Sequence, residues 1–396
     1  MKTVAHLLPN YNPFPPVFPA GTELRVEQVS RRERRYRPVV VCGHFAGQAE
    51  SETLGAMHVR RIRIGRVYRR VFQKLTRLDP VPYTARMWRI VQEEHAALVH
   101  IHNEPKLLSA LGERLTTAGR PVVVHVANEK PIDPASIPLV ARWLAASRYI
   151  AGWLEHKNGI SPRKIKVVYT GVDLRAHAAW WQIAPAERAR LRARFGVREP
   201  DARVILFAGR IVREKGVREL LDAFQSLRER HGEGVELLIA GNVRESDDPA
   251  NEKAVYGKAA VQRMQGMPGV RYVGSLHPGE MRDFLAAGDV FALPSLWDDP
   301  FPTVMLEAAA AGLPIVAAAR GGVTEFLEGC EAFDFVSRPE DPRQLAAALE
   351  RYVLSRADAE SAGRWLRRKI EGHFDWQRVA DDFESVYDGL LGEGAR

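Results

Sequence analysis

The sequence is poor in cysteine and has no long hydrophobic run. Only Cys42 and Cys330 occur among its 396 residues, far apart and outside any CxxC pattern. This argues against a disulfide framework or a structural zinc site and suits a reducing cytoplasm. No apolar stretch approaches the ~20 residues that span a bilayer, and the first residues lack the long apolar region of a signal peptide. We therefore expect a cytoplasmic protein that at most associates peripherally with the inner face of the membrane.

Acidic residues are nearly missing from one segment, residues 60–89, where Asp79 is the sole acid. Its basic residues are Arg60, Arg61, Arg63, Arg66, Arg69, Arg70, Lys74, Arg77, Arg86 and Arg89. Three interpretations remain open: a solvated arginine-rich surface, contact with anionic lipid head groups, or contact with nucleic acid. The interleaved apolar residues suit lipid, whereas no recognised nucleic-acid module accompanies the charge, so we expect no nucleic-acid partner.

Short β-branched runs alternate with helical patterns from end to end, which is typical of parallel sheets in α/β domains. The expected strands are Thr3–Leu8, Val39–Cys42, Leu98–His102, Val122–Val126, Lys166–Tyr169, Arg203–Ala208, Val235–Ala240, Val270–Val273, Val290–Leu293 and Pro314–Ala318. The pattern restarts near residue 201, so we predict two Rossmann-like, doubly wound domains, at 1–180 and 201–372. Residues 181–200 are the expected linker, and 373–396 the expected C-terminal helix.

Two cations follow the first strand of the second half. Gly209 permits a sharp turn after that strand, and Arg210 and Lys215 then stand at its carboxyl end. A bidentate donor and a mobile point charge beside a helix start suit a diphosphate.

Two carboxylates, Asp299 and Glu307, stand eight residues apart later in the same half. Asp299 falls in a loop after a strand and Glu307 in the next helix, so both can face one site above the sheet. Carboxylates accept hydrogen bonds from hydroxyls, which makes a sugar and a ribose natural partners. Gly321 and Gly322 follow the next strand and allow a ligand to approach the backbone closely.

The order of these motifs, AGR(x)4KG, DVFALPS, acid-x7-Glu and GGVTEFL, resembles glycosyltransferase family 4. The resemblance covers nearly the whole chain. Within the family, the sequence is similar to lipopolysaccharide-core and spore-coat hexosyltransferases. It implies the GT-B fold, in which two Rossmann-like domains face each other across a cleft, and a C-terminal helix that crosses back to the first domain.

The resemblance also implies roles for the second-half residues. Arg210 and Lys215 would hold the donor diphosphate, Glu307 would bind the nucleotide ribose, and Asp299 would lie near the transferred sugar. The family usually has Glu where this sequence has Asp299. The aspartate side chain is shorter than glutamate, so its carboxylate reaches less far toward the sugar.

Further donor contacts are implied around Gly322, Val323 and Thr324, whose backbone amides would face the sugar or phosphate. The family's base pocket falls near Leu276, where Glu280 is the nearest acid. A carboxylate is expected to read guanine, so this pattern mildly favours UDP over GDP.

In the first half, residues 20–23 resemble the family's glycine loop, with Gly21 as its second glycine and alanine replacing the first. His125 matches a family histidine near the transferred sugar, although a strand histidine is more often a packed core residue. His102 and Asn103, in HIHN, are candidate acceptor residues by the same resemblance.

We therefore predict a retaining glycosyltransferase that moves a hexose or N-acetylhexosamine from a nucleotide-diphosphate sugar to a cell-envelope glycan or glycolipid. Its catalytic residues would be Arg210, Lys215, Asp299 and His125, and the departing phosphate would itself take the acceptor proton. No metal and no other cofactor is expected, because the spacing of His100 and His102 fits β alternation equally well. The alternatives are a GT-B epimerase or phosphorylase, a non-catalytic nucleotide-sugar-binding scaffold and a nucleic-acid binder.

Overall fold

The computed structural model describes residues 1–17, 21–65, 75, 82–199, 201–244, 246, 248, 250–329, 335–336 and 338–392. The chain forms two compact units, which are considered separately below. The first comprises Met1–Gly171 together with the C-terminal segment that begins at Trp376, and the second comprises Val172–Asp375. The first unit thus ends nine residues before the expected position 180.

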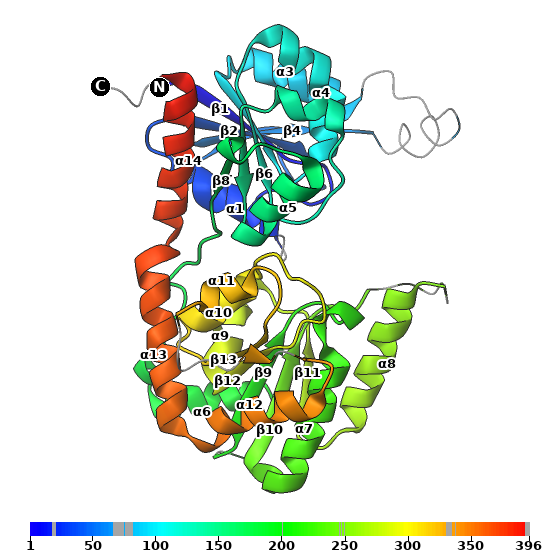
Figure 1. Cartoon of the computed structure of the whole chain (residues 1–396), viewed down its shortest axis with the longest axis vertical. Helices are drawn as coiled ribbons and strands as arrows, with labels where there is room; N and C mark the ends of the chain where they lie inside the picture. Colours follow the sequence, from blue (N-terminus) through cyan, green and yellow to red (C-terminus); the bar gives the residue numbers. More distant parts are fainter. Residues whose placement is uncertain are drawn as a thin grey trace. The chain divides into compact units, whose positions relative to one another are not determined.

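The first unit contains an eight-stranded sheet with the order β3-β4-β2-β1-β5-β6-β7-β8 (Figure 1). Its strands are β1 Thr3–Leu7, β2 Arg37–Gly43, β3 Ser51–Leu54, β4 Met57–Ile62, β5 Leu98–His102, β6 Val122–Val126, β7 Arg142–Ala145 and β8 Ile165–Val167. Only β3 runs antiparallel to its neighbour. The sequence patterns did not predict β3, β4 and β7, which are short and interrupted by arginine or polar residues.

Helices cover both faces of this sheet (Figure 1). They are α1 Gly21–Ser30, α3 Tyr83–Glu93, α4 Pro105–Ala118, α5 Arg148–Asn158 and α14 Trp376–Leu391. One face packs Leu7, Ile101 and Val124 against α3, α4 and α5. The other face packs strand residues such as Val4 against α1 and α14, whose Phe383 is fully buried. The C-terminal helix is therefore part of the first unit.

The second unit contains a parallel six-stranded sheet with the order β11-β10-β9-β12-β13-β14. Its strands are β9 Arg203–Ala208, β10 Val235–Ala240, β11 Val270–Gly274, β12 Val290–Leu293, β13 Ile315–Ala318 and β14 Phe335–Val336. Its helices are α6 Pro185–Arg194, α7 Val217–His231, α8 Glu252–Gly266, α9 Pro278–Ala287, α10 Thr303–Ala310, α11 Val323–Leu327, α12 Pro342–Leu354 and α13 Arg356–His373. Buried residues of β9 and β10 pack against α7 and α12.

The expected linker, residues 181–200, belongs to the second unit rather than separating the two. Arg188 and Arg192 of α6 both form ion pairs with Asp289, and Phe195 packs edge-on against Phe284 of α9. These contacts fix the segment to the sheet, which its polar, arginine-rich composition did not reveal.

Among the helices that the structure describes, none is long and apolar enough to cross a membrane.

Candidate functional site

Three loops of the second unit meet at the carboxyl ends of the neighbouring strands β9, β12 and β13. Backbone hydrogen bonds join them: Leu296 N donates to Glu214 O over 2.9 Å, and Gly322 N donates to Asp299 O over 2.8 Å. Arg320 adds a side-chain bond of 3.0 Å to Leu296 O. Residues separated by about a hundred positions in the sequence are thus fixed at one edge of a parallel sheet, where such sheets bind ligands.

Lys215 and Asp299, predicted from separate motifs, are in direct contact. The Lys215 ammonium forms an ion pair with Asp299 Oδ2, and the two side chains are only 14% and 7% exposed. Lys215 Nζ also lies 5.6 Å from the centre of the Trp297 ring. The indole Nε1 of Trp297 is buried and has no partner among the described residues, so it is a further donor at this site that sequence reasoning missed.

The approach of these loops depends on two glycines with left-handed backbones. Gly216 has a φ of +69°, and a Cβ there would lie 1.9 Å from the carbonyl oxygen of Pro294. Gly321 has a φ of +55°, and a Cβ there would lie 2.4 Å from the carbonyl oxygen of Asp299. No other residue type fits either position without moving the backbone.

Arg210 follows β9 and is exposed. Its side chain forms no hydrogen bond or ion pair with any other residue of the described ranges. The guanidinium is therefore available to an anion, while the nearby Lys215 is already paired.

Glu307 lies in α10 and is half-buried. Burial raises the pKa of its carboxyl group to about 7. No described residue donates a hydrogen bond to it. The group is therefore open to a hydroxyl donor, and its charge changes near neutral pH.

The other residues predicted to bind the donor sugar nucleotide already form hydrogen bonds within the protein. Gly322 N is bonded to Asp299 O, Val323 N donates to Arg320 O over 3.3 Å, and Thr324 Oγ1 donates to Gly321 O over 3.0 Å. A ligand would therefore compete with existing bonds for the amides of Gly322 and Val323, whereas the bond of Thr324 is made by its hydroxyl.

Leu276, at the predicted base pocket, is buried between β11 and α9. The neighbouring Glu280 accepts a bond of 3.0 Å from His277 N and forms an ion pair of 3.1 Å with Arg194. Its carboxylate is therefore engaged within the protein rather than free to read a base.

In the first unit, His125 of β6 is buried beside Arg25 of α1, whose Nη1 contacts both ring nitrogens of His125, Nε2 more closely than Nδ1. Burial lowers the pKa of Arg25 to about 10, and burial followed by the charge of Arg25 lowers the pKa of His125 well below its ordinary value. Arg25 has no carboxylate partner among the described residues. It is a buried cation that sequence reasoning missed, because an arginine is normally expected on the solvent-facing side of a helix.

His102 is also buried, and its Nε2 lies 3.0 Å from Nδ1 of His6 on the neighbouring strand β1. Asn103 follows with a φ of +49° and joins three segments. Its N donates to His125 O over 2.7 Å, its Oδ1 accepts from Ala127 N over 3.0 Å, and its Nδ2 lies 3.4 Å from Thr22 Oγ1. Asn103 therefore lies beside the start of α1, whose first residue is Gly21, while residue 20 lies outside the described residues.

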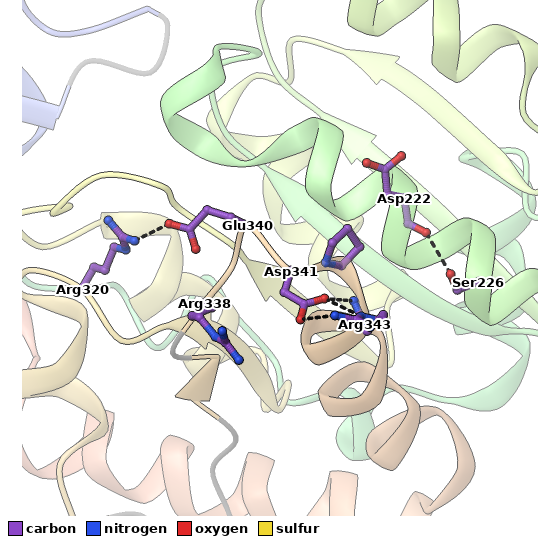
Figure 2. Close-up of a pocket in the computed structure, with 8 residues that line it drawn as sticks. Asp222, Ser226, Arg320, Arg338, Glu340, Asp341 and Arg343 are labelled. Carbon is purple, nitrogen blue, oxygen red and sulfur yellow. Dashed lines mark hydrogen bonds and ion pairs between the residues drawn. The ribbon is translucent and has the colours of Figure 1, made fainter.

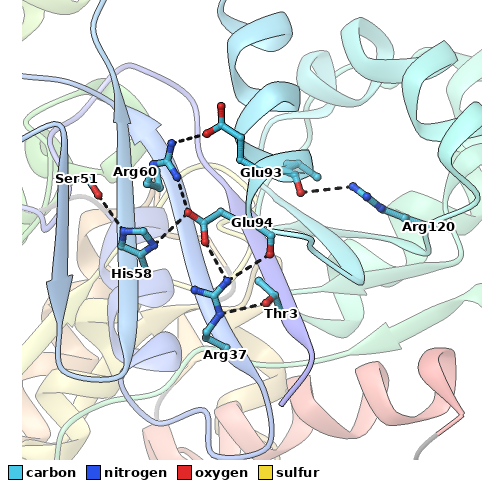
Figure 3. Close-up of polar contacts among 9 residues, drawn as sticks. Thr3, Arg37, Ser51, His58, Arg60, Glu93, Glu94 and Arg120 are labelled. Carbon is cyan, nitrogen blue, oxygen red and sulfur yellow. Dashed lines mark hydrogen bonds and ion pairs between the residues drawn. The ribbon is translucent and has the colours of Figure 1, made fainter.

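Only part of the basic region 60–89 falls within the described residues, because 66–74 and 76–81 lie outside them. Arg60 is bound to Glu93 and Glu94 (Figure 3). Burial alone would raise the pKa of Glu94, but the hydrogen bonds from Arg37 and Arg60 outweigh burial and lower it.

Arg61 is 4% exposed, donates to Phe14 O over 2.7 Å and pairs with Glu52. Arg60 and Arg61 are therefore both paired with acids of the fold. Arg63 also pairs with an acid, Glu50, over 3.1 Å, but its side chain is 62% exposed.

A separate surface pocket of the second unit contains none of the predicted residues (Figure 2). Its charges are largely matched within the protein, since Arg320 pairs with Glu340 and Arg343 with Asp341. Arg320 connects this pocket to the three loops through its bond to Leu296.

Comparison with known proteins agrees with this geometry. The Glycosyltransferase Family 4 model matches residues 20–176, and the Glycosyl transferases group 1 model matches residues 202–354. The chain is 29% identical to spore coat protein SA of Bacillus subtilis over 321 residues, which cover 78% of this chain and 83% of that protein. It is 27% identical to the lipopolysaccharide 1,2-N-acetylglucosaminetransferase of Salmonella typhimurium over 376 residues, 93% of this chain and 94% of that enzyme.

The fold is similar to that of Anabaena HepE, solved in complex with UDP and glucose. The TM-score is 0.75 at 18% identity, and the match covers 98% of this chain and 100% of HepE. The two family matches together cover most of both units. The chain therefore belongs to the GT-B glycosyltransferases, with a family 4 region in its first unit and a group 1 region in its second.

Proposed function

We propose that the protein is a retaining glycosyltransferase that uses a UDP-sugar to transfer a hexose or N-acetylhexosamine to a cell-envelope glycan or glycolipid. The observation that carries this proposal is the ion pair of Lys215 with Asp299 in the loops at the carboxyl edge of the second sheet. Arg210 belongs to the first of these loops, and Glu307 to the helix that follows the second. The acceptor class is supported by the name of the Salmonella relative, and the nucleotide by the UDP bound to HepE.

The reaction breaks the bond between the anomeric carbon and the β-phosphate oxygen. Negative charge then develops on the diphosphate, where Arg210 is free to donate two hydrogen bonds and Lys215 supplies a point charge. The acceptor hydroxyl attacks from the face that the diphosphate leaves. Its proton passes to the departing phosphate oxygen, so no enzyme nucleophile is needed.

In this proposal Asp299 also holds Lys215 in position before the donor binds. When the diphosphate attracts Lys215, the Asp299 carboxylate becomes available to hydroxyls of the sugar. Glu307 accepts hydrogen bonds from the ribose, and it does so better above pH 7, where it is ionised. This chemistry requires no metal ion.

A glycolipid acceptor would bring the enzyme to the inner face of the membrane. Because Arg60 and Arg61 are held by internal acids, we propose that any contact with anionic lipid involves exposed residues such as Arg63 and Arg89. Arg63→Glu combined with Arg89→Glu should weaken sedimentation with anionic vesicles. Unchanged sedimentation would remove these two residues from the lipid contact.

The activity is tested by incubating the pure protein with truncated lipopolysaccharide core and, separately, UDP-glucose, UDP-N-acetylglucosamine or GDP-mannose. We expect mass spectrometry to detect the addition of one sugar from a UDP donor, and NMR to show an α-anomer. The product should nearly disappear with Arg210→Ala and persist with Arg213→Ala, an exposed neighbouring cation. A β-anomer would overturn retention, and transfer from GDP-mannose alone would overturn the choice of nucleotide.

A further inference from the structure

Three histidines of the first unit form a buried group between the sheet and the helices α1 and α14. His6 comes from β1, and His100 and His102 come from β5. His6 lies opposite His100 in the strand register, and residues two apart on a strand share a face. All three are at most 1% exposed. This histidine cluster is not used in the transfer chemistry proposed above.

The ring nitrogens of the histidine cluster converge. One nitrogen from each residue lies within 4.8 Å of the corresponding nitrogens of the other two. Nδ1 of His6 and Nε2 of His102 are 3.0 Å apart. A zinc ion binds imidazole nitrogens at about 2.0–2.1 Å, which places two ligands of a tetrahedral ion roughly 3.3 Å from each other. His6 and His102 are therefore already near the separation that one ion would impose.

Two of the three imidazole rings contact a polar side chain through one of their nitrogens. His6 Nε2 lies 3.1 Å from the Glu33 carboxylate, and His100 Nδ1 lies 2.7 Å from the Tyr387 hydroxyl. This leaves His6 Nδ1 and His100 Nε2 facing inward. Metal-binding histidines commonly bond their second nitrogen to a carboxylate or other polar group, which fixes the ring and its tautomer.

Some polar atoms of this region have no partner within the described residues. They are His100 Nε2 and His102 Nδ1. Buried polar atoms are usually bonded, so each unpartnered atom calls for a physical explanation. For His100 Nε2, a cation between the rings provides one.

The charges around the histidine cluster suit neutral imidazoles. All three rings are shielded from water between the sheet and the helices. Neutral imidazole is the form that binds a metal. Arg25 opposes a further cation nearby, whereas the carboxylate of Glu33 favours it.

We propose that the histidine cluster is a structural site for one divalent transition-metal ion of the zinc class. Its ligands are His6 Nδ1, His100 Nε2 and His102 Nε2. Three imidazoles without carboxylate ligands select zinc, copper or nickel over magnesium and calcium. Because Tyr387 belongs to α14, the ion would couple the C-terminal helix to the sheet. The site is independent of the proposed function, and it replaces our expectation from sequence that the chain has no metal.

The test uses untagged full-length protein, dialysed against EDTA and then against Zn²⁺ or Co²⁺. We expect about one ion per chain by mass spectrometry of the metal content, a visible ligand-field absorption with Co²⁺, and a higher Tm with Zn²⁺. His102→Gln should lose all three effects. His156→Gln, which changes an exposed histidine of α5 in the same unit, should retain them.

A second variant covers the case in which His102→Gln fails to fold. Tyr387→Phe keeps the buried ring but removes the hydroxyl behind His100, and loss of such an outer partner typically weakens metal affinity 10–100-fold. Failure of the wild-type protein to retain Zn²⁺ or Co²⁺ would overturn the proposal. So would equal metal affinity in the wild type and in folded His102→Gln protein.

Discussion

The exposed guanidinium of Arg210 and the paired ammonium of Lys215 should respond differently to removal. Arg210 makes no hydrogen bond or ion pair within the described residues, so we expect Arg210→Ala to leave the Tm unchanged. One preorganised donor to the developing charge contributes about 3–4 kcal/mol in the transition state, or roughly 10²–10³-fold in kcat. Steady-state kinetics beside Arg213→Ala checks this, and a loss of activity shared by both variants would contradict it.

Glu307 should make stability depend on pH. Burial raises its pKa from 4.5 to about 7 in the folded protein, which therefore binds the proton more tightly than the unfolded chain does. This stabilisation is complete below pH 4.5 and is lost as the pH rises through about 7. Between pH 5 and pH 8 the wild type should lose up to about 3 kcal/mol more unfolding free energy than Glu307→Gln. Parallel urea titrations at both pH values measure the difference. If the unfolding free energies of the wild type and Glu307→Gln change equally with pH, the pKa shift is disproved.

At the residue scale, two candidate site residues taken from separate sequence motifs lie together in the structure. Lys215 and Asp299 were predicted separately and form an ion pair. Arg25 and Trp297 were missed because their burial depends on packing that no local pattern encodes. The pairing of Arg60 was not foreseen, because its partners, Glu93 and Glu94, lie outside residues 60–89, in which the charges were counted.

At the scale of single elements, the turn from β9 into α7 depends on Gly216. A side chain there must adopt a left-handed backbone and displace the Pro294 carbonyl, whereas Gly119, the left-handed residue at the end of α4 with a φ of +60°, has open space around its Cβ position. We expect Gly119→Ala to cost about 1–2 kcal/mol of unfolding free energy and Gly216→Ala at least twice as much. Urea unfolding measures the free energy that each variant loses. Equal losses would show that the loop around Gly216 rearranges easily.

Helix α14 should stabilise the first unit strongly. Phe383 is fully buried, and its ring centre lies 5.0 Å from that of His100. Phe383→Ala should cost about 3–5 kcal/mol of unfolding free energy. Leu354→Ala, at a side chain that is 63% exposed, should cost less than about 0.5 kcal/mol. Similar small effects from both changes would mean that α14 is not firmly docked.

Most strands were predictable from sequence because buried parallel strands are continuous β-branched runs, as in Val122–Val126. The alternating, arginine-bearing β4 was not, because half of its side chains face acids rather than an apolar core. Helix α6 was taken for a linker since its docking depends on ion pairs to Asp289 rather than on an apolar stripe.

At the scale of the whole molecule, the restart of the strand pattern correctly indicated two sheets of Rossmann type. The boundary was harder to place, because the first unit includes the end of the chain as well as its beginning. A linear pattern does not show where a terminal helix packs, although the apolar spacing of Val379, Phe383 and Val386 showed that it packs somewhere.

The central proposal is that the second unit binds a UDP-sugar through Glu307, Arg210 and Lys215. Thermal unfolding with UDP-sugars and GDP-sugars, repeated with Glu307→Ala, tests it most directly. A ligand at a hundred times its Kd stabilises by roughly 2.7 kcal/mol, and we predict such a shift with a UDP-sugar for the wild type and little or none for the variant. No shift with any UDP-sugar, or an equal shift in Glu307→Ala, would contradict the account.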